Sequence, residues 1–139
     1  MPTYASSEWL AAVQERLNAD PGVEAQAKNL VADLQYVIQA EPENGFPETR
    51  EVGWRMEGGR CVETWEGMRA ADFVMVAPYS VFKRVNTGEA SAADVMMKGE
   101  LQIQGELSEL MANMGALGAM QTVLETMHKD GVTEWPGSA

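Results

Sequence analysis

The chain has 139 residues, of which 45% are hydrophobic, and its 21 acidic and 10 basic residues give a formal net charge of −11 at pH 7. This length fits a single domain, residues 1–139, with its own core. The negative charge repels phosphate backbones and anionic membranes, so we expect no nucleic-acid partner and no basic membrane anchor.

The sequence also lacks the patterns of membrane insertion, secretion and disulfide bonding. No apolar run approaches the roughly 18 residues of a membrane span, so we expect no stable membrane insertion. The first eight residues do not resemble a signal peptide, which makes cytoplasmic the expected location. Cys61 is the only cysteine, so an intramolecular disulfide is excluded and the fold must be held by packing.

The N-terminal third of the chain predicts a helix followed by a strand. Ser7 is a plausible N-cap, and residues 20–22 (Asp-Pro-Gly) end the helix, whose apolar stripe comprises Trp9, Leu10, Val13 and Leu17. A short helical piece can resume at Val23. From Ala32 the pattern alternates as in a half-buried strand, with one face formed by Leu34, Tyr36, Ile38 and Ala40.

The clearest hairpin signal lies between residues 52 and 66. Residues 41–50 contain two prolines and a glycine and predict an exposed loop before it. Alternating residues then lead into Gly58-Gly59, a two-residue turn. Trp54 and Trp65 lie on the two strands and are expected to face the same side, where they would form a pocket wall; ordinary cross-strand packing is the alternative.

Residues 73–77 are apolar at every position and predict a central strand covered on both faces. Pro78 ends this strand, and helices fit residues 79–85 and 91–97. In the second helix Ser91 and Asp94 stand at capping-box spacing.

An alternating segment between Gly99 and Gly105 predicts a fifth strand, with Leu101 and Ile103 on its buried face. The period then changes to that of a helix or helix pair, with two apolar stripes: Leu107, Leu110, Met111 and Met114, then Met120, Val123, Leu124 and Met127. Residues 131–139 form a tail that either docks on the body or remains flexible.

Residues 72–114 resemble the sterol carrier protein 2 (SCP-2) lipid-transfer family. The similarity rests on the order of four features: the apolar strand at 72–76, the helix ending in Gly88, the helix at 92–97, and the glycine-bracketed strand that runs into an apolar helix. The resemblance implies an α+β fold, in which helices cover one face of a five-stranded, mostly antiparallel sheet and enclose an apolar tunnel for fatty acids, acyl-CoA or sterols.

Two departures from the family pattern bear on the ligand. Where the bracketed strand often carries lysines in this family, this chain has Glu100, Gln102 and Gln104, which argues for a ligand without a strongly anionic head. The C-terminus is not a peroxisomal signal, so a bacterial-type stand-alone carrier is the better analogy.

We therefore expect a non-enzymatic carrier that binds a hydrophobic ligand (a fatty acid, acyl chain or sterol-like molecule) without cofactor or metal. Methionines can adapt to ligands of varied shape, although ordinary core packing is the alternative for each. The polar groups considered for the mouth are Asp72, Arg84 and Gln104. The expected ligand-binding residues are Leu34, Trp54, Trp65, Met75, Phe82, Leu101, Ile103, Leu107, Leu110, Met111, Met114, Met120 and Leu124.

Two other functions remain open. An accessory or interaction subunit would use the helix at 107–127 for homodimerisation or partner binding. A small enzyme would need Cys61 and His128, the only histidine, as nucleophile and base, and a buried thiol is the simpler reading of this cysteine. Carboxylate pairs such as Glu63 and Glu66 are expected to be solvated.

Overall fold

The computed structural model describes residues 1–137 and confirms the α+β prediction. Among these residues five strands form one sheet in the order β3-β2-β1-β4-β5. Strands β1 and β4 are parallel and the other neighbours are antiparallel. The strand bounds are β1 (Val31–Gln39), β2 (Arg50–Glu57), β3 (Arg60–Glu66), β4 (Phe73–Pro78) and β5 (Gln102–Gln104).

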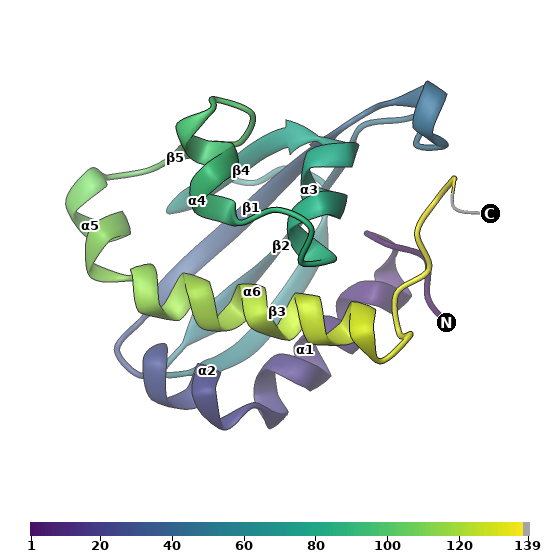
Figure 1. The fold of residues 1–139 in the computed structure, drawn as a ribbon. Helices are drawn as coiled ribbons and strands as arrows, with labels where there is room; N and C mark the ends of the chain where they lie inside the picture. The colour runs from purple at the N-terminus through teal and green to yellow at the C-terminus, as the bar shows by residue number, and fades with distance from the viewer. Residues whose placement is uncertain (138–139) are drawn as a thin grey trace.

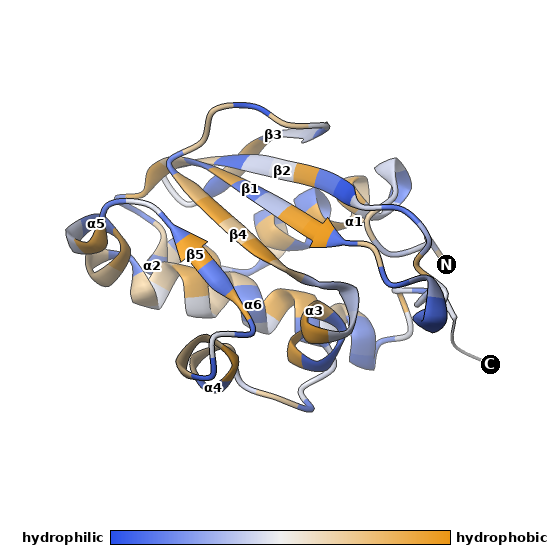
Figure 2. Cartoon of the chain, turned by 90° about the horizontal axis from the view of Figure 1, so that it is seen from above, coloured by the Kyte–Doolittle hydropathy of each residue, from blue (hydrophilic) through white to orange (hydrophobic). Residues whose placement is uncertain are grey.

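The helices lie on one face of this sheet, as the family resemblance implied, and Figure 2 shows the strands above them. In Figure 1 the longest helix, α6, crosses in front of the sheet, with α3 and α4 beside it. None of the helices in residues 1–137 is long and apolar enough to cross a membrane. Their bounds are α1 (Ser7–Ala19), α2 (Pro21–Gln26), the 3-10 helix η1 (Pro42–Asn44), α3 (Tyr79–Asn86), α4 (Ala92–Met97), α5 (Leu107–Ala112) and α6 (Met114–Lys129).

The core lies between the sheet and the helices. The inner face of β1 supplies Ala32, Leu34 and Ile38, all buried. Helix α1 packs against β3 and buries Trp9, Leu10, Val13 and Leu17. The apolar stripe predicted for α1 is therefore confirmed, but its N-cap is Ser6 rather than Ser7, because the Ser6 hydroxyl accepts the backbone N–H of Trp9 at 3.1 Å.

The two hairpin tryptophans lie on opposite faces of the sheet, so the prediction that they share a side is wrong. A two-residue turn without a bulge would pair Trp65 with Val52, on the face of Trp54. The register instead shifts between Arg55 and Met56, and Trp65 pairs with Gly53. One extra residue in β3 reverses the facing of every side chain beyond it.

Strand β4 buries Phe73, Met75 and Ala77 against the helices, whereas Val74 and Val76 on the other face are only half-buried. The prediction of full cover on both faces is therefore too strong. The strand predicted between the two glycines is shorter than expected, since only residues 102–104 pair with β4.

The C-terminal apolar segment is a helix pair that breaks at Asn113. The second predicted stripe, Met120, Val123, Leu124 and Met127, is buried in the core. The first stripe is not, because α5 turns away from the sheet, and Leu107 and Met111 are each 68% exposed.

The tail is docked as far as the structure describes it. Trp135 is buried, its ring centroid 4.6 Å from that of Tyr4, and its indole N–H donates to His128 Nδ1 at 3.1 Å. Thr3 and Glu134 form a parallel bridge. Residues 138–139, the end of the predicted flexible tail, lie outside the described residues.

Candidate functional site

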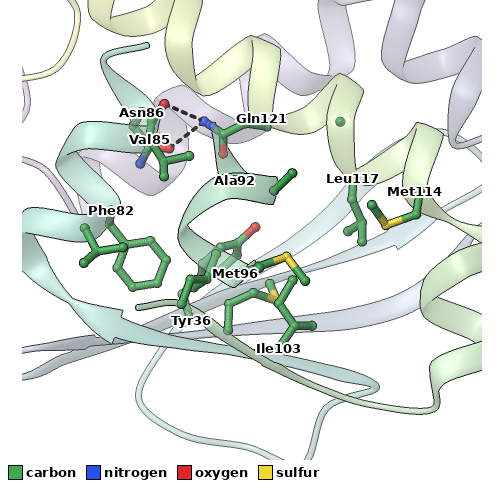
Figure 3. A pocket seen from close by; sticks show the side chains of 15 residues that line it. Tyr36, Phe82, Val85, Asn86, Ala92, Met96, Ile103, Met114, Leu117 and Gln121 are labelled. Carbon is green, nitrogen blue, oxygen red and sulfur yellow. Dashed lines mark hydrogen bonds between the residues drawn. The ribbon is translucent and has the colours of Figure 1, made fainter. Parts of the chain in front are cut away.

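An apolar pocket of about 200 Å³ lies between the sheet and helices α3, α4 and α6 (Figure 3). Its floor comes from β1, β4 and β5 and its walls from the helices. The lining residues are Tyr36, Met75, Val81, Phe82, Val85, Asn86, Ala92, Ala93, Met96, Leu101, Ile103, Met114, Leu117, Gly118 and Gln121.

Local sequence explains why this space stays open. Helix α4 is short and begins with two alanines, and its first turn is stabilised because the Ser91 hydroxyl accepts the N–H of Asp94 at 3.1 Å. Opposite it, Gly118 of α6 leaves a gap, since a Cβ at this position would meet no atom within 4 Å. The space stays open because the residues that face it from these two helices have side chains too small to fill it.

Polar contacts in the pocket involve neutral side chains. The Gln121 amide nitrogen donates to Asn86 Oδ1 at 2.9 Å and to the Val85 carbonyl oxygen at 3.2 Å, which ties α6 to α3. Tyr36 packs against Trp54 with ring centroids 4.6 Å apart. Burial raises the pKa of Tyr36, so its hydroxyl stays protonated at neutral pH.

The structure brings together some of the residues expected to bind a ligand and separates the others. Those that line the pocket are Met75, Phe82, Leu101, Ile103 and Met114. Leu34, Trp54, Met120 and Leu124 are buried in the core outside it. Leu110 is half-buried on α5, Leu107 and Met111 are exposed there, and Trp65 lies on the outer face of the sheet.

Sequence reasoning missed the polar residues Tyr36, Asn86 and Gln121. Tyr36 could have been found, because it shares the predicted inner face of its strand with Leu34. Gln121 had a weaker signal, a polar residue beside the apolar stripe of Met120 and Leu124. Nothing in the sequence indicated that Gly118 lines the pocket, because its role depends on the open space in front of it.

The polar residues considered for the mouth do not line the pocket. Asp72 accepts the backbone N–H of Asp33 at 2.8 Å, Arg84 forms an ion pair with Glu100, and Gln104 is exposed on β5. Glu100 therefore pairs with a cation and does not line the pocket.

The groups considered for catalysis are poorly suited to it. Cys61 is buried, and burial raises the pKa of its thiol to about 11, so little thiolate forms at neutral pH. His128 accepts the Trp135 indole N–H at a helix end. Within residues 1–137 no group of three or more His, Cys, Asp or Glu side chains could hold a metal ion.

In residues 1–137 a layer of helices covers one face of the mixed sheet, and the apolar pocket lies between the two layers. The profile of the SCP-2 sterol transfer family matches residues 10–118. The chain therefore belongs to the SCP-2 sterol transfer family. No curated protein sequence shows a significant match to the chain.

Solved structures share the fold over most of the chain. A crystal structure of sterol carrier protein 2 is 22% identical, with a TM-score of 0.80 over 88% of this chain and 97% of that one. A conserved hypothetical protein of Thermus thermophilus, described as possibly a sterol carrier protein, is 23% identical, with a TM-score of 0.75 over 87% of each chain. Palmitated SCP2L2 of Aedes aegypti is 11% identical, with a TM-score of 0.56 over 78% and 88%.

Proposed function

We propose that this protein is a non-enzymatic carrier that holds a hydrophobic ligand in the pocket between the sheet and helices α3, α4 and α6. The observation that carries the proposal is the lining, which is apolar except for three neutral side chains. Membership of a sterol transfer family and the palmitated state of one relative support it. Transfer of apolar surface from water would supply affinity at about 25 cal/mol per Å².

The pocket would have to widen for a full-length lipid. Its volume of about 200 Å³ is below the roughly 300 to 1,000 Å³ of drug-sized ligand sites. Met75, Met96 and Met114 line it, and unbranched methionines change rotamer at little cost. Met114, which is 52% exposed, stands where the pocket meets solvent.

Two adjacent methionines of α4 provide a matched test. Met96 lines the pocket, whereas Met97 is 87% exposed. A carrier should bind an uncharged fluorescent lipid analogue, and Met96→Glu should weaken that binding by at least about tenfold because it places a charge in the apolar site. Met97→Glu adds the same charge and should bind like the wild type.

Binding would be measured by fluorescence titration, and native mass spectrometry would identify any co-purified molecule. The carrier proposal is rejected if the wild-type protein neither binds the analogue nor co-purifies with a small molecule. It is also rejected if Met96→Glu and Met97→Glu, both shown to be folded by circular dichroism, weaken binding equally.

A second candidate is an accessory subunit that dimerises or binds a partner protein. The observation that favours it is the exposed apolar surface on α5 and the start of α6, where Leu107, Met111 and Met114 are 68%, 68% and 52% exposed. Light scattering should then show an oligomer that Met111→Lys dissociates, while Val62→Lys, which alters an exposed residue of β3, leaves it intact. A monomeric wild-type protein would exclude the homodimer.

A further inference from the structure

The pocket contains no charged group. Of its lining residues only Tyr36, Asn86 and Gln121 have polar side chains, and none is Asp, Glu, Lys, Arg or His. A ligand carboxylate placed here would lose its hydration without gaining an opposite charge. That cost is much larger than the cost of burying a neutral group whose hydrogen bonds are satisfied.

Gln121 presents a hydrogen-bond acceptor to the pocket. Both hydrogens of its amide nitrogen are used, one by Asn86 Oδ1 and one by the Val85 carbonyl oxygen. Because the Val85 partner is a carbonyl oxygen, the side chain cannot be reversed without losing this bond. Its own carbonyl oxygen is left over, and Figure 3 shows that oxygen on the pocket side of the side chain.

Tyr36 presents a hydrogen-bond donor to the same space. Its ring is wedged between Trp54 and Phe82, at centroid distances of 4.6 and 6.0 Å. Figure 3 shows its hydroxyl directed into the pocket, and within residues 1–137 the hydroxyl has no hydrogen-bond partner. Buried tyrosine hydroxyls usually have one, so this donor is available to a ligand.

We propose that Tyr36 and Gln121 form the specificity-determining pair for the ligand's polar end, and that they select a neutral hydroxyl over a carboxylate. This inference rests on the carrier function proposed above. An alcohol oxygen can accept from Tyr36 and donate to the Gln121 oxygen at once. An ester can only accept a hydrogen bond. An ionised carboxylate has no proton to donate to the Gln121 oxygen that it would face.

Three ligands with the same chain test the pair: decanol, methyl decanoate and decanoate, each used to displace an apolar fluorescent probe at neutral pH. The expected order of affinity is decanol, then the ester, then decanoate, with decanol at least about tenfold tighter than decanoate. Tyr36→Phe should weaken decanol about threefold to tenfold, the range of one net hydrogen bond, and leave the probe unchanged.

Tyr79→Phe is the matched control, because the Tyr79 hydroxyl donates to the Pro136 carbonyl oxygen outside this pocket. It should leave the order of the three ligands unchanged. If the probe and decanol bind but decanoate binds equally or more tightly, this inference is overturned while the carrier function stands. Unchanged decanol binding in Tyr36→Phe overturns it too. If neither probe nor decanol binds, the carrier function fails and the inference with it.

Discussion

The Trp65 indole lies directly over Gly53 on the outer face of the sheet. A Cβ at Gly53 would be 2.4 Å from Trp65 Cζ2 and 2.5 Å from the Leu34 carbonyl oxygen, so no larger residue fits without movement. The contact exists because the hairpin register pairs these two residues. The Trp65 ring covers part of the outer sheet face, over which no helix of residues 1–137 lies.

Gly53→Ala should therefore destabilise the protein by about 1 to 3 kcal/mol, the usual cost of overpacking. Urea unfolding followed by circular dichroism measures this. Gly118→Ala is the control, since a Cβ at Gly118 meets open space in a helix and should stabilise by up to about 1 kcal/mol. Equal stability of the two variants would show that the Gly53 contact is unimportant.

Gln35 should be required for the stability of the outer face. It is fully buried, and its Oε1 accepts from the Trp65 indole N–H at 3.0 Å and from the Arg69 backbone N–H at 3.2 Å. Gln35→Leu leaves both donors without their partner, so we expect a loss of about 1 to 3 kcal/mol of unfolding free energy. Thermal and urea unfolding would check this, with Gln39→Leu at an exposed position of β1 as the control. A loss no larger than that of the control would contradict the assignment.

The Cys61 thiol should react slowly in the folded protein. Its pKa is raised from 9.0 to about 11 by burial, so at pH 8 thiol reagents should label it far more slowly than in urea. The raised pKa favours the protonated thiol, so its contribution to stability is present below pH 9 and is lost as the pH rises toward 11. Cys61→Ala should lack this part of the pH dependence. Rapid labelling under native conditions would contradict the buried position.

Trp135 should anchor the tail to the body. Trp135→Ala removes a buried ring that packs on Tyr4 and is expected to cost about 3 to 5 kcal/mol. Trp135→Phe keeps most of that packing but loses the hydrogen bond to His128, so it should cost less. The measurement is urea unfolding, and a tail that contributes nothing would leave all three proteins equally stable.

Hydrophobic periodicity and the positions of turn-forming residues were sufficient to predict most of the helices and strands. The alternation from Ala32 to Ile38 and the stripe from Trp9 to Leu17 each indicate which side is buried, because period 2 and period 3.6 place side chains on fixed faces. The Ser91 cap was predicted correctly for the same reason, since it depends only on neighbours three residues apart. Five of the thirteen expected ligand-binding residues line the pocket. Two of them, Leu101 and Ile103, lie on the predicted buried face of the fifth strand, whereas Met114 belongs to the stripe that is largely exposed.

The errors arose where non-local geometry decides. The bulge near Arg55 reversed the side of Trp65, and a single inserted residue leaves no periodic trace in the sequence. The break at Asn113 turned Leu107 and Met111 outward, although their spacing matches a buried stripe as well as Met120 and Leu124 do.

The amino-acid sequence alone determined the α+β class, the family resemblance and the net charge, because these depend on local periodicity and composition. Only the tertiary structure decided where the pocket lies and which polar atoms face it. Tyr36 is far along the chain from Gly118 and Gln121, and the space between them exists because the parallel pairing of β1 with β4 and the packing of α6 over α3 bring their elements together.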